Sequence, residues 1–271
     1  MRIILTGSST GIGHALAERL ITHGHDVWGL ARSTQDERHR SGGTFTPLRC
    51  DVTDWEQVEA AVRQVSAVWP HVDALITCAA IQGEVGRTLT SNPDNWRTTM
   101  RANIEGTFNV IRAFAPSLAR APRRAKIVCF SGGGASKARP NFSAYGIAKT
   151  GIVRLVETIA KEEESHLLDI NAVAPGAIHT RMTEEVVQLG PEVVGEAEYA
   201  SATKLKRDAD IAMPRALDLV EWLLSPTSDG LSGRLISAVW DAIPDLEKQM
   251  SDLVDGDIYT LRRILPQDRS L

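Results

Sequence analysis

The sequence lacks the marks of several protein classes. Its three cysteines, Cys50, Cys78 and Cys129, show no Cys-X-X-Cys spacing, which argues against a disulfide scaffold and a zinc site. Each lies in or beside apolar residues, so we expect buried, reduced thiols. No apolar run approaches the ~20 residues of a membrane span, and the first is too short for a signal peptide. We therefore expect a cytoplasmic protein without a membrane partner.

Positive charge is not in excess either. Lys and Arg number 30 against 34 Asp and Glu, and no long basic run occurs, so we expect no nucleic-acid partner. The seven histidines show no HExxH-like spacing, so no metal is expected. What is present is a chain of 271 residues, 43% of them hydrophobic, which is enough for a large core.

Short apolar runs alternate with longer amphipathic segments up to about Val239. The runs predict strands at 2–7, 26–32, 45–52, 72–80, 125–133, 168–176 and 233–239. The segments between them predict helices at 12–24, 53–70, 92–120 (interrupted near Pro116), 143–165 and 214–225. This alternation indicates an α/β fold: a single Rossmann-like domain over residues 1–271, with a doubly wound parallel sheet of about seven strands and helices on both faces.

Two segments fall outside the alternation. Residues from about 179 to 213 are mostly polar, and so long an insertion between a strand and a helix is typical of a lid. The alternative is a solvated surface excursion. The tail from about 241 to 271 follows the last strand, and we expect it to pack on a neighbouring subunit or over the site.

A glycine-rich stretch, "TGSSTGIG", joins the first strand to the first helix at residues 6–13. Glycines let the backbone approach a pyrophosphate closely, and the helix that follows offers free amide hydrogens and a positive dipole end. The stretch lacks the lysine of a phosphate-loop NTPase. It predicts a dinucleotide site at the carboxyl ends of the strands; the alternative is a tight turn without a ligand.

The end of the second strand bears on the choice of dinucleotide. The sequence there is "GLARS", with Ala31 where an acid would select NAD and Arg32 directly after it. A basic residue at this point favours a 2′-phosphate, so we predict NADP(H). If Arg32 only covers the adenine, NAD(H) is usable too.

The stretch "YGIAK" places Tyr145 and Lys149 one turn apart on one face of a predicted helix. A free tyrosine has a pKa of ~10 and is a poor base, and a neighbouring ammonium would lower that pKa. The pair would then serve as an acid/base. On spacing alone, a solvated surface pair is the alternative.

Seven stretches together resemble the short-chain dehydrogenase/reductase family: "TGSSTGIG", "CDVTD", "ALITCAA", "ANIEGTF", "FSGGGA", "YGIAK" and "NAVAPGAIHT". They occur in the family's order from Arg2 to about Val239. The resemblance implies Tyr145 as acid/base, Lys149 on the nicotinamide ribose and Asn103 in a proton relay through water. It implies, together with the glycine turn and Arg32, cofactor contacts at Gly7, Ser9, Thr10, Gly11, Ile12, Gly13, Arg32, Asp51, Val52, Ala79, Tyr145, Lys149, Pro175, Gly176, Ile178 and Thr180.

One departure from the family concerns the serine that orients the substrate carbonyl. Gly132 occupies its usual position, and Ser131 lies one residue further from Tyr145. A one-residue insertion in the glycine-rich connection would bring Ser131 into register, so we predict Ser131 as the catalytic serine. Ser143 and Ser136 are fallbacks, and Ser131 as a mere strand end is the alternative.

The resemblance implies an NAD(P)-dependent oxidoreductase that interconverts a carbonyl and a secondary alcohol by hydride transfer. The sequence leaves two alternatives: a nucleotide-sugar epimerase or dehydratase, and a non-catalytic dinucleotide-sensing scaffold. The substrate is a small molecule whose identity the sequence does not give. Family members are usually homodimers or homotetramers, built on helices whose apolar positions here include Ile111, Phe114, Val153 and Val156. Packing within one subunit accounts for these positions equally well.

Overall fold

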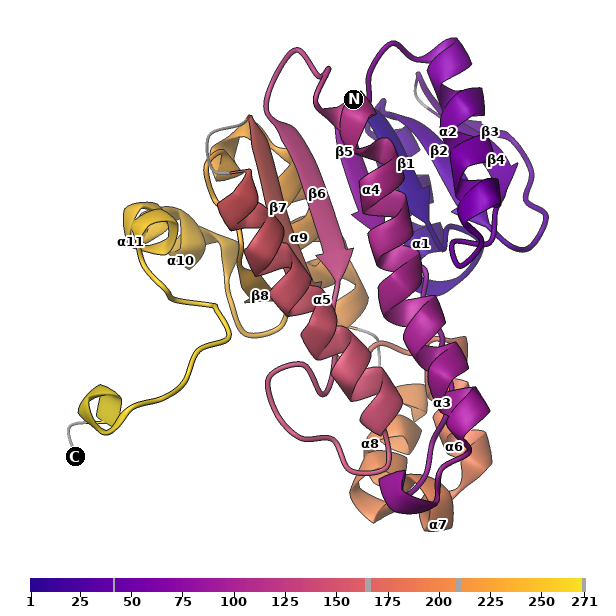
Figure 1. The fold of residues 1–271 in the computed structure, drawn as a ribbon, viewed down its shortest axis with the longest axis vertical. Helices are drawn as coiled ribbons and strands as arrows, with labels where there is room; N and C mark the ends of the chain where they lie inside the picture. The colour runs from indigo at the N-terminus through magenta and orange to yellow at the C-terminus, as the bar shows by residue number, and fades with distance from the viewer. Residues whose placement is uncertain (41, 164–166, 208–210, 270–271) are drawn as a thin grey trace.

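The computed structural model describes residues 1–40, 42–163, 167–207 and 211–269. Its centre is an eight-stranded sheet in the order β3-β4-β2-β1-β5-β6-β7-β8 (Figure 1). All neighbouring strands run parallel except β3 and β4. The predicted doubly wound α/β sheet is therefore confirmed. The strands are β1 (Arg2–Thr6), β2 (Asp26–Ala31), β3 (Arg38–Arg40), β4 (Gly43–Arg49), β5 (Ala74–Thr77), β6 (Ala125–Phe130), β7 (Leu168–Ala174) and β8 (Leu235–Ser237).

The strand missing from the sequence prediction is β3. Its residues are Arg-His-Arg, and it pairs antiparallel with β4 at the edge of the sheet. A charged edge strand has no buried face and hence no apolar pattern, so its composition is the same as that of a loop.

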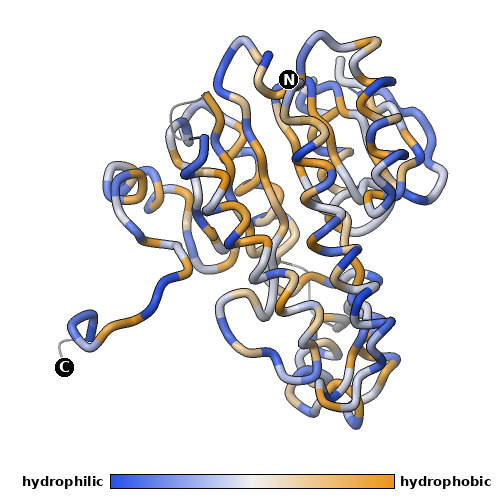
Figure 2. Tube along the Cα trace, in the orientation of Figure 1, coloured by the Kyte–Doolittle hydropathy of each residue, from blue (hydrophilic) through white to orange (hydrophobic). Residues whose placement is uncertain are grey.

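Helices cover both faces of the sheet. On one face, α1 (Gly11–Thr22) and α9 (Ala212–Leu224) pack against residues such as Ile3 and Leu5. On the other face, α2 (Trp55–Val68), α4 (Gly106–Leu118) and α5 (Ser143–Glu162) pack against Ile4 and its neighbours. Successive residues of a strand point to opposite faces, so continuously apolar strands supply both cores. Figure 2 shows these strands as mainly hydrophobic.

The long predicted helix is continuous but not regular. It consists of α3 (Pro93–Met100), a π-helical turn η2 (Arg101–Glu105) and α4. The predicted interruption near Pro116 was wrong, because Pro116 lies inside α4 and the helix ends two residues later at Leu118. The irregular turn surrounds Asn103 instead, and π-helical turns of this kind frequently occur at functional sites.

The segment expected as a lid is helical. It holds α6 (Arg181–Leu189), α7 (Pro191–Val194) and α8 (Glu196–Arg207), beyond the carboxyl ends of the strands (Figure 1). Val186, Val194 and Ala202 form a small apolar cluster with Phe142, from the loop before α5. The segment is therefore packed on the rest of the protein rather than being a solvated excursion.

The tail divides into two parts. Its first part, α10 (Ile243–Lys248) and α11 (Met250–Asp255), packs on its own subunit and buries Leu246 and Leu253 in the core beside α9. The last part, with η4 (Pro266–Arg269), extends away from the body of the protein and away from the carboxyl ends of the strands (Figure 1). The short helices η1 (Thr88–Thr90) and η3 (Pro226–Ser228) complete the elements. Over the described ranges, no helix has the length and apolar character needed to cross a membrane.

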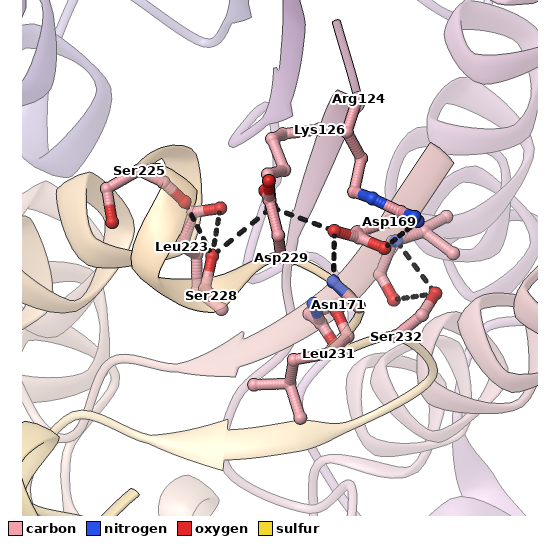
Figure 3. A network of polar contacts seen from close by, with 12 residues as sticks. Arg124, Lys126, Asp169, Asn171, Leu223, Ser225, Ser228, Asp229, Leu231 and Ser232 are labelled. Carbon is pink, nitrogen blue, oxygen red and sulfur yellow. Dashed lines mark hydrogen bonds and ion pairs between the residues drawn. The ribbon is translucent and has the colours of Figure 1, made fainter. Parts of the chain in front are cut away.

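The amino ends of β6 and β7 carry a buried polar network (Figure 3). Lys126 and Asp169 face each other across the two strands, and Lys126 Nζ lies 2.8 Å from the Asp169 carboxylate. Lys126 forms a second ion pair, with Asp229, at 2.6 Å. Arg124 forms an ion pair with the other carboxylate oxygen of Asp169 at 3.0 Å. The buried charges at this edge of the sheet are thus paired within the protein.

The three thiols are free, as predicted. Cys50 and Cys129 are buried, and Cys78 is half-buried. Burial raises the pKa of Cys50 and of Cys129 to about 11, and that of Cys78 to about 12. These thiols are therefore protonated at neutral pH and are poor nucleophiles.

Candidate active site

A cavity of about 610 Å³ lies at the carboxyl ends of the strands. It spans the boundary between β1 and β5, where the strand order reverses and where open α/β sheets bind their ligands. The predicted site residues that line it are Gly7, Ser9, Thr10, Gly11, Ile12, Arg32, Asp51, Val52, Ala79, Ser131, Tyr145, Lys149, Pro175 and Thr180. Segments far apart in the sequence therefore meet in one cavity.

Four predicted site residues are not among those that line the cavity: Gly13, Asn103, Gly176 and Ile178. Gly13 packs beneath the glycine turn, and Ile178 is buried in the core beside α9. Asn103 is fully buried and binds the backbone next to the cavity, as described below. Gly13, Asn103 and Ile178 therefore lie behind the residues that line the cavity.

The glycine turn fits a group that approaches the backbone closely. Gly7 has a φ of +69°, and a Cβ there would lie 2.7 Å from the backbone nitrogen of Ala79. A Cβ on Gly13 would lie 2.2 Å from the carbonyl oxygen of Gly7. Only glycine allows this turn, which brings the amino end of α1 to the cavity with its positive dipole end and free N–H groups.

The far end of the cavity holds Arg32 and Asp51. Arg32 is exposed at the end of β2, and within the described residues it has neither a hydrogen bond nor an ion pair. The Asp51 carboxylate accepts hydrogen bonds from the backbone N–H and the hydroxyl of Thr53, both at 2.9 Å. This end of the cavity therefore offers the Arg32 guanidinium, which has no partner among the described residues, and the Asp51 carboxylate, whose orientation is fixed by Thr53.

Tyr145 and Lys149 lie on the buried face of α5, where the sequence placed them. The side chain of Lys149 is only 2% exposed, and its Nζ donates to the carbonyl oxygen of Phe130 at 2.9 Å. The ammonium lies 5.5 Å from the centroid of the Tyr145 ring. Across the described part of the chain, the phenol hydroxyl has no hydrogen-bond partner, so it is available to a ligand.

The expected effect of Lys149 on the phenol was wrong for the protein without a cofactor. Burial raises the pKa of Tyr145 to about 12, and the charge that opposes this rise is Arg139 rather than Lys149. Burial also lowers the pKa of Lys149, to about 8. Desolvation disfavours both charged forms, and here it outweighs the attraction between phenolate and ammonium.

Arg139 connects this site to α8. Its guanidinium lies 3.8 Å above the ring of Phe142 and 5.7 Å from the centroid of the Tyr145 ring. It also forms an ion pair with Glu198 of α8 at 3.0 Å. The charge nearest to the phenol on this side is thus held by a residue of α8.

The side-chain amide of Asn103 binds backbone groups of the loop after β5 and of α3. Its Nδ2 donates to the carbonyl oxygen of Ile81 at 3.0 Å and to that of Thr99 at 2.9 Å, and its Oδ1 accepts from the Ile81 N–H at 3.2 Å. Both backbone groups of Ile81 are therefore fixed by one amide. The π-helical turn presents Asn103 to this segment.

Ser131 and Gly132 are placed differently from each other. The Ser131 backbone N–H continues the strand pairing by donating to Val173 at 2.8 Å, and its hydroxyl donates to the backbone carbonyl of Lys149 at 3.1 Å. At Gly132, an added Cβ would lie 3.0 Å from the phenol oxygen of Tyr145. The position that faces the phenol is thus Gly132, while Ser131 lines the cavity and its hydroxyl donates to the backbone.

Some cavity residues were not singled out from the sequence. They are Ser33, Gln82, Thr98, Arg101, Met182 and Glu185. Gln82 is one of them and lies in the loop after β5. No motif marks it, because its position depends on how the chain after β5 packs against α3 and the π-helical turn.

Residues 1–189 match the family model of the short chain dehydrogenases. This chain belongs to that family. A short-chain reductase protein of Streptomyces niveus, NovJ, is 32% identical over 209 residues, which are 73% of this dehydrogenase and 79% of the relative. A benzil reductase of Saccharomyces cerevisiae, IRC24, is 26% identical over 247 residues, with 86% and 94% of the two chains covered.

Solved structures agree with the dehydrogenase fold. The aldohexose dehydrogenase of Thermoplasma acidophilum superimposes with a TM-score of 0.74 over 89% of this chain and 94% of its own, at 24% identity. At that identity the likeness bears on the fold alone. The family assignment predicted from the seven motifs is confirmed, and it makes this short-chain dehydrogenase an oxidoreductase that uses a nicotinamide dinucleotide.

Proposed function

We propose that this protein is an NADP-preferring dehydrogenase/reductase that interconverts a carbonyl and a secondary alcohol, with Tyr145 as the acid/base. One observation carries the proposal: the unpartnered phenol of Tyr145 and the buried ammonium of Lys149 face the same cavity as the glycine turn. A proton donor thus lies in the cavity that would hold the dinucleotide.

The residues present fit a dinucleotide. The backbone cradle of Gly7 and Gly13 leaves no room for a Cβ, and the free amides of α1 suit a pyrophosphate. When bound, the nicotinamide supplies or accepts the hydride. Asp51 would accept from the adenine amino group, and Arg32, which has no partner among the described residues, would hold a 2′-phosphate. The uncommitted guanidinium is what supports NADP(H) over NAD(H).

The chain's own contribution is proton transfer at the phenol oxygen. With a pKa of about 12, Tyr145 is protonated at neutral pH and serves as an acid toward the oxygen of a carbonyl undergoing reduction. Lys149, held against the carbonyl of Phe130, would bind the nicotinamide ribose and stabilise the phenolate that remains. Ser131 and Asn103 stay proposed members of the site: Ser131 lines the cavity at the end of β6, and Asn103 would take part in a proton relay through water.

Two alternatives are less well supported. An epimerase or dehydratase of nucleotide sugars would have a longer C-terminal substrate domain, whereas α10 and α11 pack here on the core beside α9. A dinucleotide-sensing scaffold would not require a tyrosine and a lysine buried together. Titration with NADPH separates the sensor from the enzyme, since a sensor would bind the cofactor but oxidise none of it.

The remaining proposals concern the assembly and its location. The apolar residues Ile111, Phe114, Val153 and Val156 are used inside one subunit, where all are buried. Phe108 on α4 and Ile147 on α5 are 48% and 50% exposed, and they offer an apolar surface for a homodimer or homotetramer. We place the enzyme in the cytoplasm.

The experiment that tests the activity is a screen of benzil, cyclohexanone and glyceraldehyde with NADPH, and of 2-propanol and glucose with NADP⁺. The readout is the absorbance of the reduced nicotinamide. Turnover of at least one compound, faster with NADP(H) than with NAD(H), is the expected result. Binding of NADPH without any turnover across the panel would instead support the sensor.

A further inference from the structure

The position facing the Tyr145 phenol from the end of β6 has no side chain. Gly132 occupies it, and the hydroxyl of the preceding Ser131 donates to the backbone carbonyl of Lys149. Charge builds up on the carbonyl oxygen during hydride transfer, and a second fixed hydrogen-bond donor there lowers the barrier. The site therefore needs a donor from another element.

Gln82 is the cavity residue with an unused donor. Its side chain is 97% buried, since only 3% of it is exposed, and it lines the same cavity as Tyr145 and Lys149. Among the described residues, its Nε2 has no hydrogen-bond partner, and this atom has almost no accessible surface. Burying an unsatisfied amide costs roughly 1–3 kcal/mol, so we expect the amide to turn its Nε2 toward the cavity when a ligand with an acceptor is bound.

The backbone on both sides of Gln82 is fixed. On one side, the Asn103 amide binds both the N–H and the carbonyl of Ile81. On the other side, the Glu84 N–H donates to the Thr99 hydroxyl at 2.9 Å. The backbone that carries the donor is therefore held by α3 and the π-helical turn, so only a rotation of the side chain is needed to present the amide to a ligand.

We propose that Gln82 Nε2 is the hydrogen-bond donor that orients the substrate's carbonyl oxygen beside Tyr145, at a site where Gly132 provides no hydroxyl. This inference rests on the proposed function. The proton that ends on the substrate oxygen comes from Tyr145, and Gln82 keeps both of its amide protons throughout. The amide is neutral across the working range of pH, so it acts without a titration of its own.

The test uses the fastest carbonyl substrate of the panel above, with Gln82→Leu as the main variant. We expect its kcat/KM for reduction to fall by about 10²-fold, as when one oxyanion donor is removed, with the NADPH dissociation constant unchanged by fluorescence titration. Gln82→Glu keeps the shape and replaces the donor by a carboxylate, so it should lose at least as much. Cofactor binding and the thermal unfolding midpoint show that either variant is folded.

Gly132 supplies a rescue experiment with a matched control. In the Gln82→Leu background, Gly132→Ser should recover about tenfold of the lost kcat/KM by placing a hydroxyl next to the phenol. Gly132→Ala adds the same Cβ without a hydroxyl and should recover none. A readout without turnover is the side-chain amide NMR signal of Gln82, identified by its loss in Gln82→Leu, which should shift when benzil is added.

Other outcomes would overturn the inference. If Gln82→Leu and Gln82→Glu keep the wild-type kcat/KM, Gln82 is not the donor. If Ser131→Ala alone loses about 10²-fold, the serine predicted from the sequence orients the carbonyl instead. A wild-type protein that turns over nothing in the panel would overturn the proposed function, and this inference with it.

Discussion

Two buried lysines lie at opposite ends of β6, and they differ in the partners that surround their ammonium groups. Lys126, at the amino end, is 3% exposed and pairs with Asp169 and Asp229 (Figure 3). Lys149, at the carboxyl end, is 2% exposed, and among the described residues its one hydrogen-bond acceptor is the neutral carbonyl of Phe130. The pKa of Lys149 falls to about 8 because burial removes its hydration and the described residues give it no carboxylate partner.

The difference separates a structural role from a functional one. A buried charge that is paired within the fold has no need of a ligand, whereas an unpaired one is costly unless something else makes use of it. Gln82, which lines the same cavity as Lys149, also has a buried polar atom without a partner among the described residues. The cavity thus holds polar groups that the fold does not pair, whereas Lys126 is paired within the fold.

The largest effect should come from replacing each lysine by methionine. Lys149→Met should lower turnover by about 10²–10⁴-fold, since the acid/base loses its charged partner. Lys126→Met should leave Asp169 buried without its main partner and lower the free energy of unfolding by roughly 3–5 kcal/mol, with turnover in the folded fraction close to wild type. Steady-state rates and urea unfolding of both variants check this.

The stability of the Lys149→Met variant should move in the opposite direction. A pKa lowered from 10.5 to about 8 corresponds to roughly 3 kcal/mol, less about 1 kcal/mol for the lost hydrogen bond to Phe130. We therefore expect the cofactor-free variant to gain roughly 2 kcal/mol in the free energy of unfolding. Equal destabilisation by both methionine variants would contradict the contrast between the two lysines.

The pH dependence of stability gives the same contrast without changing the fold. The pKa of Lys149 is lower in the folded protein, so above pH 8 this side chain binds more protons in the unfolded chain and contributes a rise in the free energy of unfolding up to about pH 10.5. The three thiols oppose this rise, because their raised pKa values make the unfolded chain lose their protons first. The measurement is therefore the difference in the free energy of unfolding between Lys149→Met and the wild type, by urea unfolding across this range. The stability advantage of the variant should shrink as the pH rises.

Arg32 is a second cation at the carboxyl edge without a partner in the described part of the protein. Its replacement by alanine should weaken NADPH binding by about 10–100-fold, which corresponds to the loss of a charge-assisted hydrogen bond. Binding of NADH should change by less than about twofold, because NADH has no 2′-phosphate. Fluorescence titration with both cofactors measures the ratio, and equal weakening would argue against the assigned contact.

The smallest effect is expected at Arg139, the charge that lowers the pKa of the buried phenol. Arg139→Gln should raise the pKa of Tyr145 further. The rise in the rate of alcohol oxidation with pH should therefore move to higher pH, with a change of roughly two- to fivefold at neutral pH. Glu198→Gln, which leaves the cation in place, is the control and should move the profile less.

Much of this was predictable from local patterns. Apolar runs located seven of the strands, and "YGIAK" placed two side chains on one face of α5. Asp54 accepts from the Gln57 N–H and caps α2, as expected of an Asp at the start of a helix. These features depend on a few neighbouring residues, so the sequence carries them directly.

What could not be predicted depends on packing between distant segments. The sign of the pKa shift at Tyr145 depends on how deeply the phenol is buried, and no motif gives that depth. Gln82 gains its place because its neighbours Ile81 and Glu84 bind Asn103 and Thr99, which lie further along the sequence. The helices α6 to α8 pack together through an apolar cluster that includes Phe142, which lies far upstream in the sequence.

Tyr145→Phe, compared with the wild type on the fastest carbonyl of the panel, measures the central role most directly. The variant keeps the ring and loses only the hydroxyl that donates the proton. The account predicts an unchanged NADPH dissociation constant and a kcat lower by at least about 10²-fold. Full activity in this variant would contradict it, because the proton would then reach the substrate oxygen without Tyr145.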